Sequence, residues 1–125
     1  MKPVKQTRFG PNVGNCFEAC VASLLEIPLS EVGDFGGDDV FEDNLAKWLA
    51  DRGLIYVLVN GPDFIENEML QAMFAQGDVY HIIEGISPRG GPHAIVGLNG
   101  KPEFDPHDGT GLWKVDGFGF LLKRL

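Results

Sequence analysis

The sequence contains little cysteine. Cys16 and Cys20 are the only two cysteines among 125 residues, and they stand four positions apart. Two such close neighbours make a poor disulfide framework, so the sequence predicts a reducing, cytoplasmic compartment. A structural zinc site would need two further ligands, and the sequence has neither a second cysteine pair nor two histidines at helical spacing. We therefore expect no metal site.

Basic residues are also scarce. Ten Lys and Arg stand against 18 Asp and Glu, which gives a formal net charge of −8. Nucleic-acid binding needs clustered Lys and Arg for the phosphates, so this balance argues against a nucleic-acid partner. It also disfavours docking on an anionic membrane surface. Small molecules, peptides and basic proteins are left as partners.

No long apolar run is present. The longest nearly uncharged one, residues 20–25, is far below the ~20 residues that span a bilayer. Residues 1–5 include two lysines and a proline, so we expect no signal peptide. The length suits one domain, and we expect residues 1–125 to share a single core.

One strongly apolar segment, residues 16–27, is followed by Pro28. Only three of its residues are polar, and a helix that is apolar on nearly every side belongs in the middle of a domain. Asn15 is a suitable N-cap, which would place Cys16 in the first helical turn. The sequence therefore predicts a central helix that begins at Cys16.

Local patterns predict the other elements. Capping-box pairs, Asp39 with Glu42 and Asp63 with Glu66, indicate helices over about residues 40–52 and 64–76. Short β-type runs cover residues 54–59, 79–86, 93–98, 101–104 and 114–122. Asn99-Gly100 is a strong signal for a two-residue hairpin. Because helices precede most of the strands, we expect an α+β fold: an N-terminal central helix packed on a C-terminal antiparallel sheet.

Three residues suggest nucleophilic chemistry. A thiol at a helix N-terminus feels the positive end of the helix dipole, so we expect Cys16 to have a lowered pKa. His93 opens one predicted strand and Asp105 follows the next, across the Asn99-Gly100 turn. The hairpin would bring the imidazole to the carboxylate, and the imidazole could then serve as base for the thiol.

Each of these residues has a structural alternative. Cysteine is often buried, so Cys16 could belong to the core, and for Cys20 we favour the core over a resolving thiol. Two other histidines compete with His93 for the role of the base. His81 suits a structural role inside a strand, and His107 suits a solvated turn. Asp105 before Pro106 could be a turn residue.

Two glycine-rich segments have compositions that could suit ligand-binding loops. The stretch Gly36-Gly37-Asp38-Asp39 fits a loop before a helix better than a metal loop, since its spacing does not match an EF-hand. The stretch Gly117-Phe118-Gly119-Phe120 fits a strand with a close backbone approach better than a phosphate loop.

The motifs resemble those of a known superfamily. Gly14-Asn15-Cys16-Phe17 before an apolar helix is similar to the start of the central helix in papain-like cysteine peptidases. The stretch His93-Ala-Ile-Val and the pair Asp105-Pro106 resemble the bacteriocin-processing branch, in the same chain order. More narrowly, these stretches resemble small proteins of phages and bacteria, which implies the cytoplasm of a bacterial or phage-infected cell.

The resemblance implies a papain-like fold and a Cys16–His93–Asp105 triad that hydrolyses a peptide, isopeptide or similar amide through an acyl-thioester. Such chemistry needs no cofactor, and the partner would be a peptide or protein substrate. Gly10 occupies the position where these enzymes usually carry an oxyanion-binding glutamine. The candidates for that role are therefore the side chains of Gln6, Asn12 and Asn15, together with the Cys16 backbone N–H.

Several alternatives stay open at this level. Arg89, in the turn-rich segment before His93, could meet a substrate carboxylate or could simply belong to a loop. The same triad could pass the acyl group to an amine as a transferase. The missing glutamine motivates a different hypothesis, a catalytically silent binding module, for example a phage protein that blocks a host factor. A structural or assembly role has no positive support in the sequence.

Overall fold

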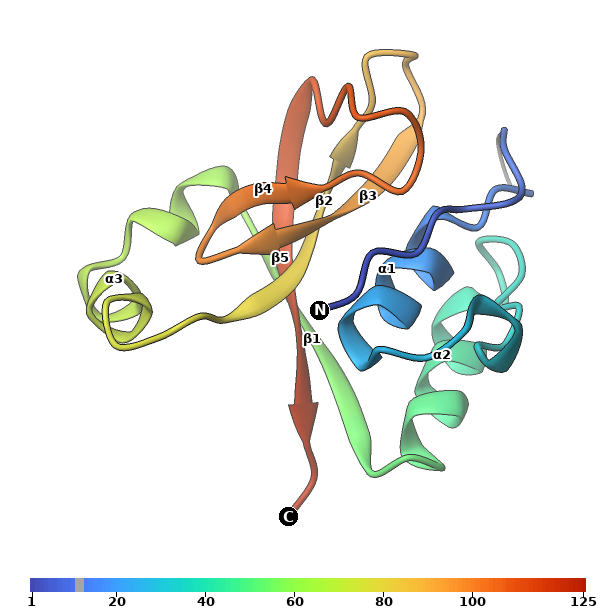
Figure 1. Ribbon diagram of the computed structural model, residues 1–125, viewed down its shortest axis with the longest axis horizontal. Helices are drawn as coiled ribbons and strands as arrows, with labels where there is room; N and C mark the ends of the chain where they lie inside the picture. Colours follow the sequence, from blue (N-terminus) through green and yellow to red (C-terminus); the bar gives the residue numbers. More distant parts are fainter. Residues whose placement is uncertain (11–12) are drawn as a thin grey trace.

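A single antiparallel sheet organises the chain in the computed structural model, which describes residues 1–10 and 13–125 (Figure 1). The α+β class predicted from the sequence is confirmed. The helices are α1 (Cys16–Leu25), α2 (Phe41–Ala50) and α3 (Glu68–Phe74), with 3₁₀ turns η1 (Leu29–Glu31) and η2 (Pro62–Glu66). The strands are β1 (Leu54–Asn60), β2 (Tyr80–Ile86), β3 (Pro92–Leu98), β4 (Lys101–Phe104) and β5 (Lys114–Lys123).

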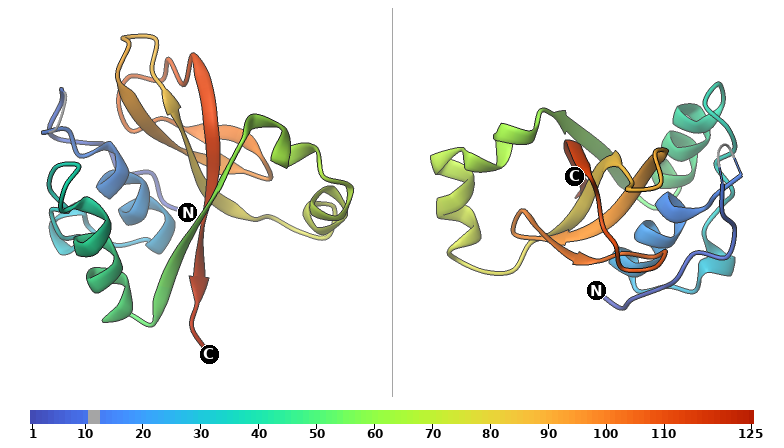
Figure 2. Two further views of the ribbon diagram at one scale, coloured as in Figure 1. Left: turned by 180° about the vertical axis from the view of Figure 1, so that it is seen from behind. Right: turned by 90° about the horizontal axis from the view of Figure 1, so that it is seen from above.

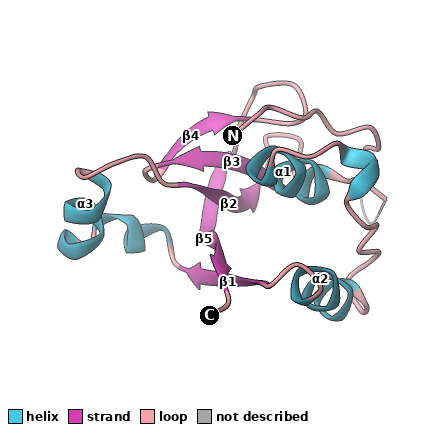
Figure 3. Cartoon of the chain, turned by 60° about the horizontal axis from the view of Figure 1, so that its bottom comes forward, coloured by secondary structure: helices cyan, strands magenta, loops and turns pink. Residues whose placement is uncertain are grey.

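The strand order is β1-β5-β2-β3-β4, and every pairing is antiparallel. Four strands come from the C-terminal part of the chain, as expected. The fifth, β1, precedes α3 in the sequence and pairs with β5 at the edge of the same sheet. Helices α1 and α2 lie on one side of the sheet and α3 lies on the other (Figures 2 and 3).

The main core lies between α1 and the sheet. Ala19, Cys20, Val21 and Ala22 are all fully buried, which agrees with a helix that is apolar on nearly every side. Cys20 and Val21 pack with side chains from the sheet and from α2, including Ile82, Val96 and Leu49. A smaller cluster on the other face joins Ile83, Ile95 and Phe118. This packing fixes the first turn of α1 against β3.

The β3–β4 hairpin forms as predicted. Asn99 and Gly100 have φ of 50° and 86°, and two positive φ angles are what a type I′ turn requires. Leu98 pairs with Lys101, and β4 ends at Phe104, directly before Asp105. The hairpin therefore returns the chain toward the start of β3.

Two predicted helix starts are wrong in detail. Helix α2 has Val40 at its N-cap with no side-chain cap, so the Asp39–Glu42 capping box does not form. The predicted helix over residues 64–76 is split into η2 and α3. Asn67 separates the two, and its side chain accepts a hydrogen bond from the Leu70 N–H, which makes it the N-cap of α3.

None of the helices in the described part of the chain is long and apolar enough to cross a membrane.

Candidate active site

Cys16 and His93 line the same cavity. Cys16 is half-buried at the first residue of α1, and His93 is the second residue of β3. The cavity has a volume of about 410 Å³ and lies where the starts of α1 and α2 meet the sheet. We call it the Cys16 cavity, and its lining is Cys16, Phe17, Asp38, Phe41, Leu58, Asn60, Glu84, Gly85, Pro92, His93, Ala94, Asp116 and Gly117.

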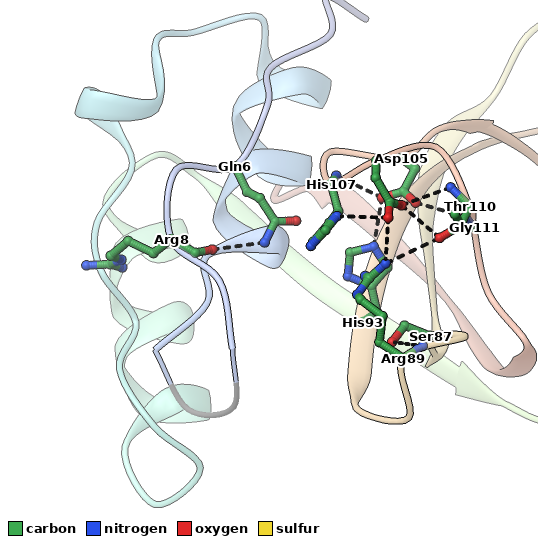
Figure 4. Close-up of polar contacts among 10 residues, drawn as sticks. Gln6, Arg8, Ser87, Arg89, His93, Asp105, His107, Thr110 and Gly111 are labelled. Carbon is green, nitrogen blue, oxygen red and sulfur yellow. Dashed lines mark hydrogen bonds and ion pairs between the residues drawn. The ribbon is translucent and has the colours of Figure 1, made fainter.

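His93 and Asp105 form a buried pair. His93 Nε2 lies 2.7 Å from Asp105 Oδ1, and both side chains are 4% exposed (Figure 4). The carboxylate also accepts the backbone N–H of His107 at Oδ1 and that of Gly111 at Oδ2, each at 2.9 Å. Burial alone would raise the pKa of Asp105, but these three donors together lower it. Asp105 is thus held as an anion against the imidazole.

This pairing selects one nitrogen of the imidazole. With Nε2 donating to Asp105, Nδ1 is the nitrogen that can accept a proton. No hydrogen bond joins Cys16 Sγ to His93 within the described residues, so the two are neighbours across the cavity rather than a bonded pair. A carbonyl group between the sulfur and the imidazole would find a nucleophile on one side and a base on the other.

The Cys16 thiol has a raised pKa. Burial is the main cause, and the nearby Glu18 carboxylate adds to it. The backbone N–H groups of Ala94, Phe17 and Cys16 itself act in the opposite direction, but they do not outweigh burial. The predicted lowering of this pKa is therefore wrong, because the start of α1 is packed against β3 instead of lying open to solvent.

The three side chains proposed for the oxyanion differ in their placement, and neither Gln6 nor Asn15 lines the Cys16 cavity. Gln6 Nε2 donates to the Arg8 carbonyl at 2.9 Å (Figure 4). Asn15 Oδ1 accepts the N–H groups of Thr7 and Arg8, and its Nδ2 donates to Thr7 Oγ1. Asn15 thus holds the N-terminal segment instead of capping α1 with its side chain. Asn12 lies outside the described residues.

Backbone groups take the place of those side chains around the sulfur. The N–H groups of Cys16 and Phe17 belong to the first turn of α1, where no carbonyl of the helix can accept them. Together with the Ala94 N–H they favour the thiolate and so lower the pKa of Cys16, although burial outweighs them. Donors at a helix N-terminus are well suited to a developing oxyanion.

Arg89 is engaged outside the cavity. Its Nη1 lies 3.1 Å from Asp108 Oδ2 and 3.3 Å from Thr110 Oγ1. Arg89 is absent from the residues that line the Cys16 cavity. Arg89 therefore lies in the turn between β2 and β3 and contacts the loop after β4, not Cys16, which agrees with the loop interpretation.

The remaining histidines and the second cysteine have packing roles. His81 is fully buried, and its Nε2 accepts the Gly100 N–H at 2.9 Å. Burial lowers the pKa of His81, so it stays neutral. Cys20 is fully buried and its pKa is raised well above the ordinary value, mainly by desolvation. His107 contacts the rings of Phe9 and His93 edge to face.

A carboxylic acid that we did not predict also lines the cavity. Glu84, in the middle of β2, pairs with Ala94 across the strands and accepts a 2.6 Å hydrogen bond from Tyr56 Oη. Burial raises the pKa of Glu84, and the Tyr56 hydroxyl opposes this. The available signal was a single acidic residue within the apolar run of residues 79–86.

No group of three or more His, Cys, Asp or Glu side chains among the described residues could hold a metal ion. What the site offers is a thiol, an imidazole oriented by a carboxylate, and backbone donors around the sulfur. Comparison of the chain with protein-family models, with curated proteins and with solved structures finds no match.

Proposed function

We propose that the protein is a small papain-like cysteine hydrolase that cleaves a peptide, isopeptide or similar amide bond. The observation that carries this proposal is the buried His93–Asp105 pair, whose imidazole lines the same cavity as Cys16 at the start of a helix. A buried imidazole that is paired with a carboxylate and lies at the same cavity as a thiol is a candidate functional site. The central helix on an antiparallel sheet further supports a papain-like arrangement.

In the first half of the reaction, Cys16 Sγ attacks the carbonyl carbon of the amide. Its proton passes to His93 Nδ1, and Asp105 stabilises the imidazolium through Nε2. The negative charge on the carbonyl oxygen is met by backbone N–H groups in the first turn of α1. The imidazolium then protonates the leaving nitrogen, the C–N bond breaks, and an acyl-thioester on Cys16 remains.

In the second half, a water molecule gives a proton to His93 and attacks the thioester carbonyl. The C–S bond breaks, the carboxylic acid leaves, and the proton returns to the thiolate. An amine in place of water would make the same site a transferase. Because burial raises the pKa of Cys16, the resting site holds a neutral thiol, and His93 acts as a true general base.

Two observations favour a second candidate, a binding module without turnover. The same raised pKa of Cys16 disfavours a reactive thiolate, and the Gln6 amide already donates to Arg8. Such a protein would use the cavity for recognition alone. Thiol reactivity separates the two candidates.

The discriminating experiment is alkylation of the native protein by iodoacetamide as a function of pH. Because burial raises the pKa of Cys16, direct reaction of the thiolate should grow only above the ordinary thiol pKa of ~8.5. If His93 assists, Cys16 should also react near pH 7. His93→Gln should remove the neutral-pH reaction, because glutamine can donate to Asp105 but is no base. Above the thiol pKa the two proteins should react alike.

Cys16→Ser supplies the blank, since Cys20 is fully buried. Superimposable pH profiles for wild type and His93→Gln would contradict the hydrolase proposal and favour the binding module.

A further inference from the structure

A second cavity adjoins the first. It has a volume of about 520 Å³ and lies between α2 and the sheet. We call it the α2 groove, and its lining is Phe41, Glu42, Leu45, Ala46, Leu49, Leu54, Ile55, Tyr56, Leu58, Glu84 and Arg124. Three of these residues, Phe41, Leu58 and Glu84, also line the Cys16 cavity. The two cavities therefore share a wall and together lead from the thiol along β1.

The α2 groove is apolar over most of its length. Its lining along β1 runs from Leu54 to Leu58, which at ~3.3 Å per residue is about 13 Å. Among the lining residues, Arg124 alone is basic. It lies next to the first residue of β1, because Leu54 pairs with Lys123, the residue before Arg124. A space of this length fits a few apolar side chains of an extended segment.

Two glycines in β5 leave space for the Tyr56 side chain beneath the groove. Phe118 packs on the opposite face of the sheet, so Gly117 and Gly119 face α1 and α2. A Cβ on Gly119 would lie 1.6 Å from Tyr56 Oη. The missing side chain thus allows the Tyr56 ring to cross β5 and its hydroxyl to reach Glu84. This is the close backbone approach expected for residues 117–120.

The polar groups in the groove favour a peptide over an alkyl chain as its occupant. Tyr56 donates to Glu84 Oε2, and Glu84 Oε1, which is open to solvent, accepts no hydrogen bond from any described residue. An alkyl chain would cover this oxygen without a partner, which costs free energy. A peptide brings N–H groups between its apolar side chains and can satisfy it.

Building on the proposed function, we propose that the α2 groove binds an apolar peptide segment adjacent to the scissile bond, and so sets the substrate preference. The segment would lay its side chains against Leu45, Leu49 and Leu58 and present an N–H to Glu84.

The test measures binding without turnover, in the Cys16→Ser protein. Three fluorescein-labelled probes are titrated by fluorescence polarisation: a hexapeptide amide rich in leucine, its serine counterpart, and a decanoyl amide. We expect the leucine peptide to bind at least about tenfold more tightly than the other two, since burial of two leucine side chains is worth more than this factor.

Ala46→Trp should abolish that preference, because Ala46 is exposed at the rim and an indole there would fill the groove. Ala50→Trp, on the same helix but outside the lining, should keep it. Leu58→Trp provides a second block from β1 if Ala46→Trp unfolds. Equal binding of the two peptides, tighter binding of the decanoyl amide, or an unchanged preference in both blocked variants would each overturn the proposal. None of these readings depends on whether the wild type hydrolyses an amide.

Discussion

Cys16→Ser is expected to lower turnover of any peptide that the wild type cleaves by at least about 1,000-fold, with the fold unchanged. A serine hydroxyl is a far weaker nucleophile than a thiol, and its much higher pKa makes its proton harder for His93 to remove. The substitution is nearly isosteric at the first residue of α1, so the packing of that helix against β3 should persist. Peptide cleavage followed by mass spectrometry measures the effect, and thermal unfolding checks the fold.

Cys20→Ala is the matched control, one helical turn further along α1. Cys20 is fully buried in the core, so its truncation should cost about 1–2 kcal/mol of unfolding free energy. Turnover per folded molecule should stay at the wild-type level. Full activity in Cys16→Ser, or loss of chemistry in Cys20→Ala with the fold intact, would show that the nucleophile has been misassigned.

Asp105→Asn is expected to lower kcat by about tenfold or more, with a smaller effect on KM. Asparagine keeps the size of the side chain, but its single oxygen can accept only one of the two N–H groups, that of His107 at Oδ1 or that of Gly111 at Oδ2. It removes the charge that faces His93 Nε2 at 2.7 Å. That charge matters most when the imidazolium forms, which is after the substrate has bound.

Asp108→Asn is the control in the same loop. Asp108 pairs with Arg89 and accepts hydrogen bonds from Thr110 at the surface, where ion pairs contribute little. Its substitution should be nearly silent in steady-state kinetics. A severe defect in Asp108→Asn alone would mean that the third member of the site is misassigned. If neither variant is impaired, the site works as a Cys–His dyad and Asp105 is a structural turn residue.

The features that the sequence predicted well depend on local rules. The apolar segment after Asn15 could only be a central helix, and Asn99-Gly100 dictated a type I′ hairpin. The pairing of His93 with Asp105 followed from that hairpin, since two strands joined by a two-residue turn return to the same place. These inferences needed no knowledge of the distant parts of the chain.

The features that the sequence missed depend on tertiary packing. Nothing local indicates that β1 joins the sheet beside β5, and this placement brings Tyr56 to Glu84 and forms the α2 groove. The use of Asn15 to hold Thr7 and Arg8 also depends on where the N-terminal segment runs. The pKa of Cys16 followed burial by β3 instead of the helix dipole, because desolvation is set by neighbours that are remote in sequence.

The central claim is that Cys16 carries the acyl group during amide cleavage. The most direct measurement is the mass of the protein after acid quenching during steady-state cleavage of a peptide substrate, followed by mapping of the modified fragment. The account predicts a mass increase equal to the acyl part of the substrate, located on Cys16. This acyl-thioester should last longest when water is the only nucleophile that can attack it. Continued cleavage with Cys16 unmodified at every quench time, and undiminished in Cys16→Ser, would contradict it.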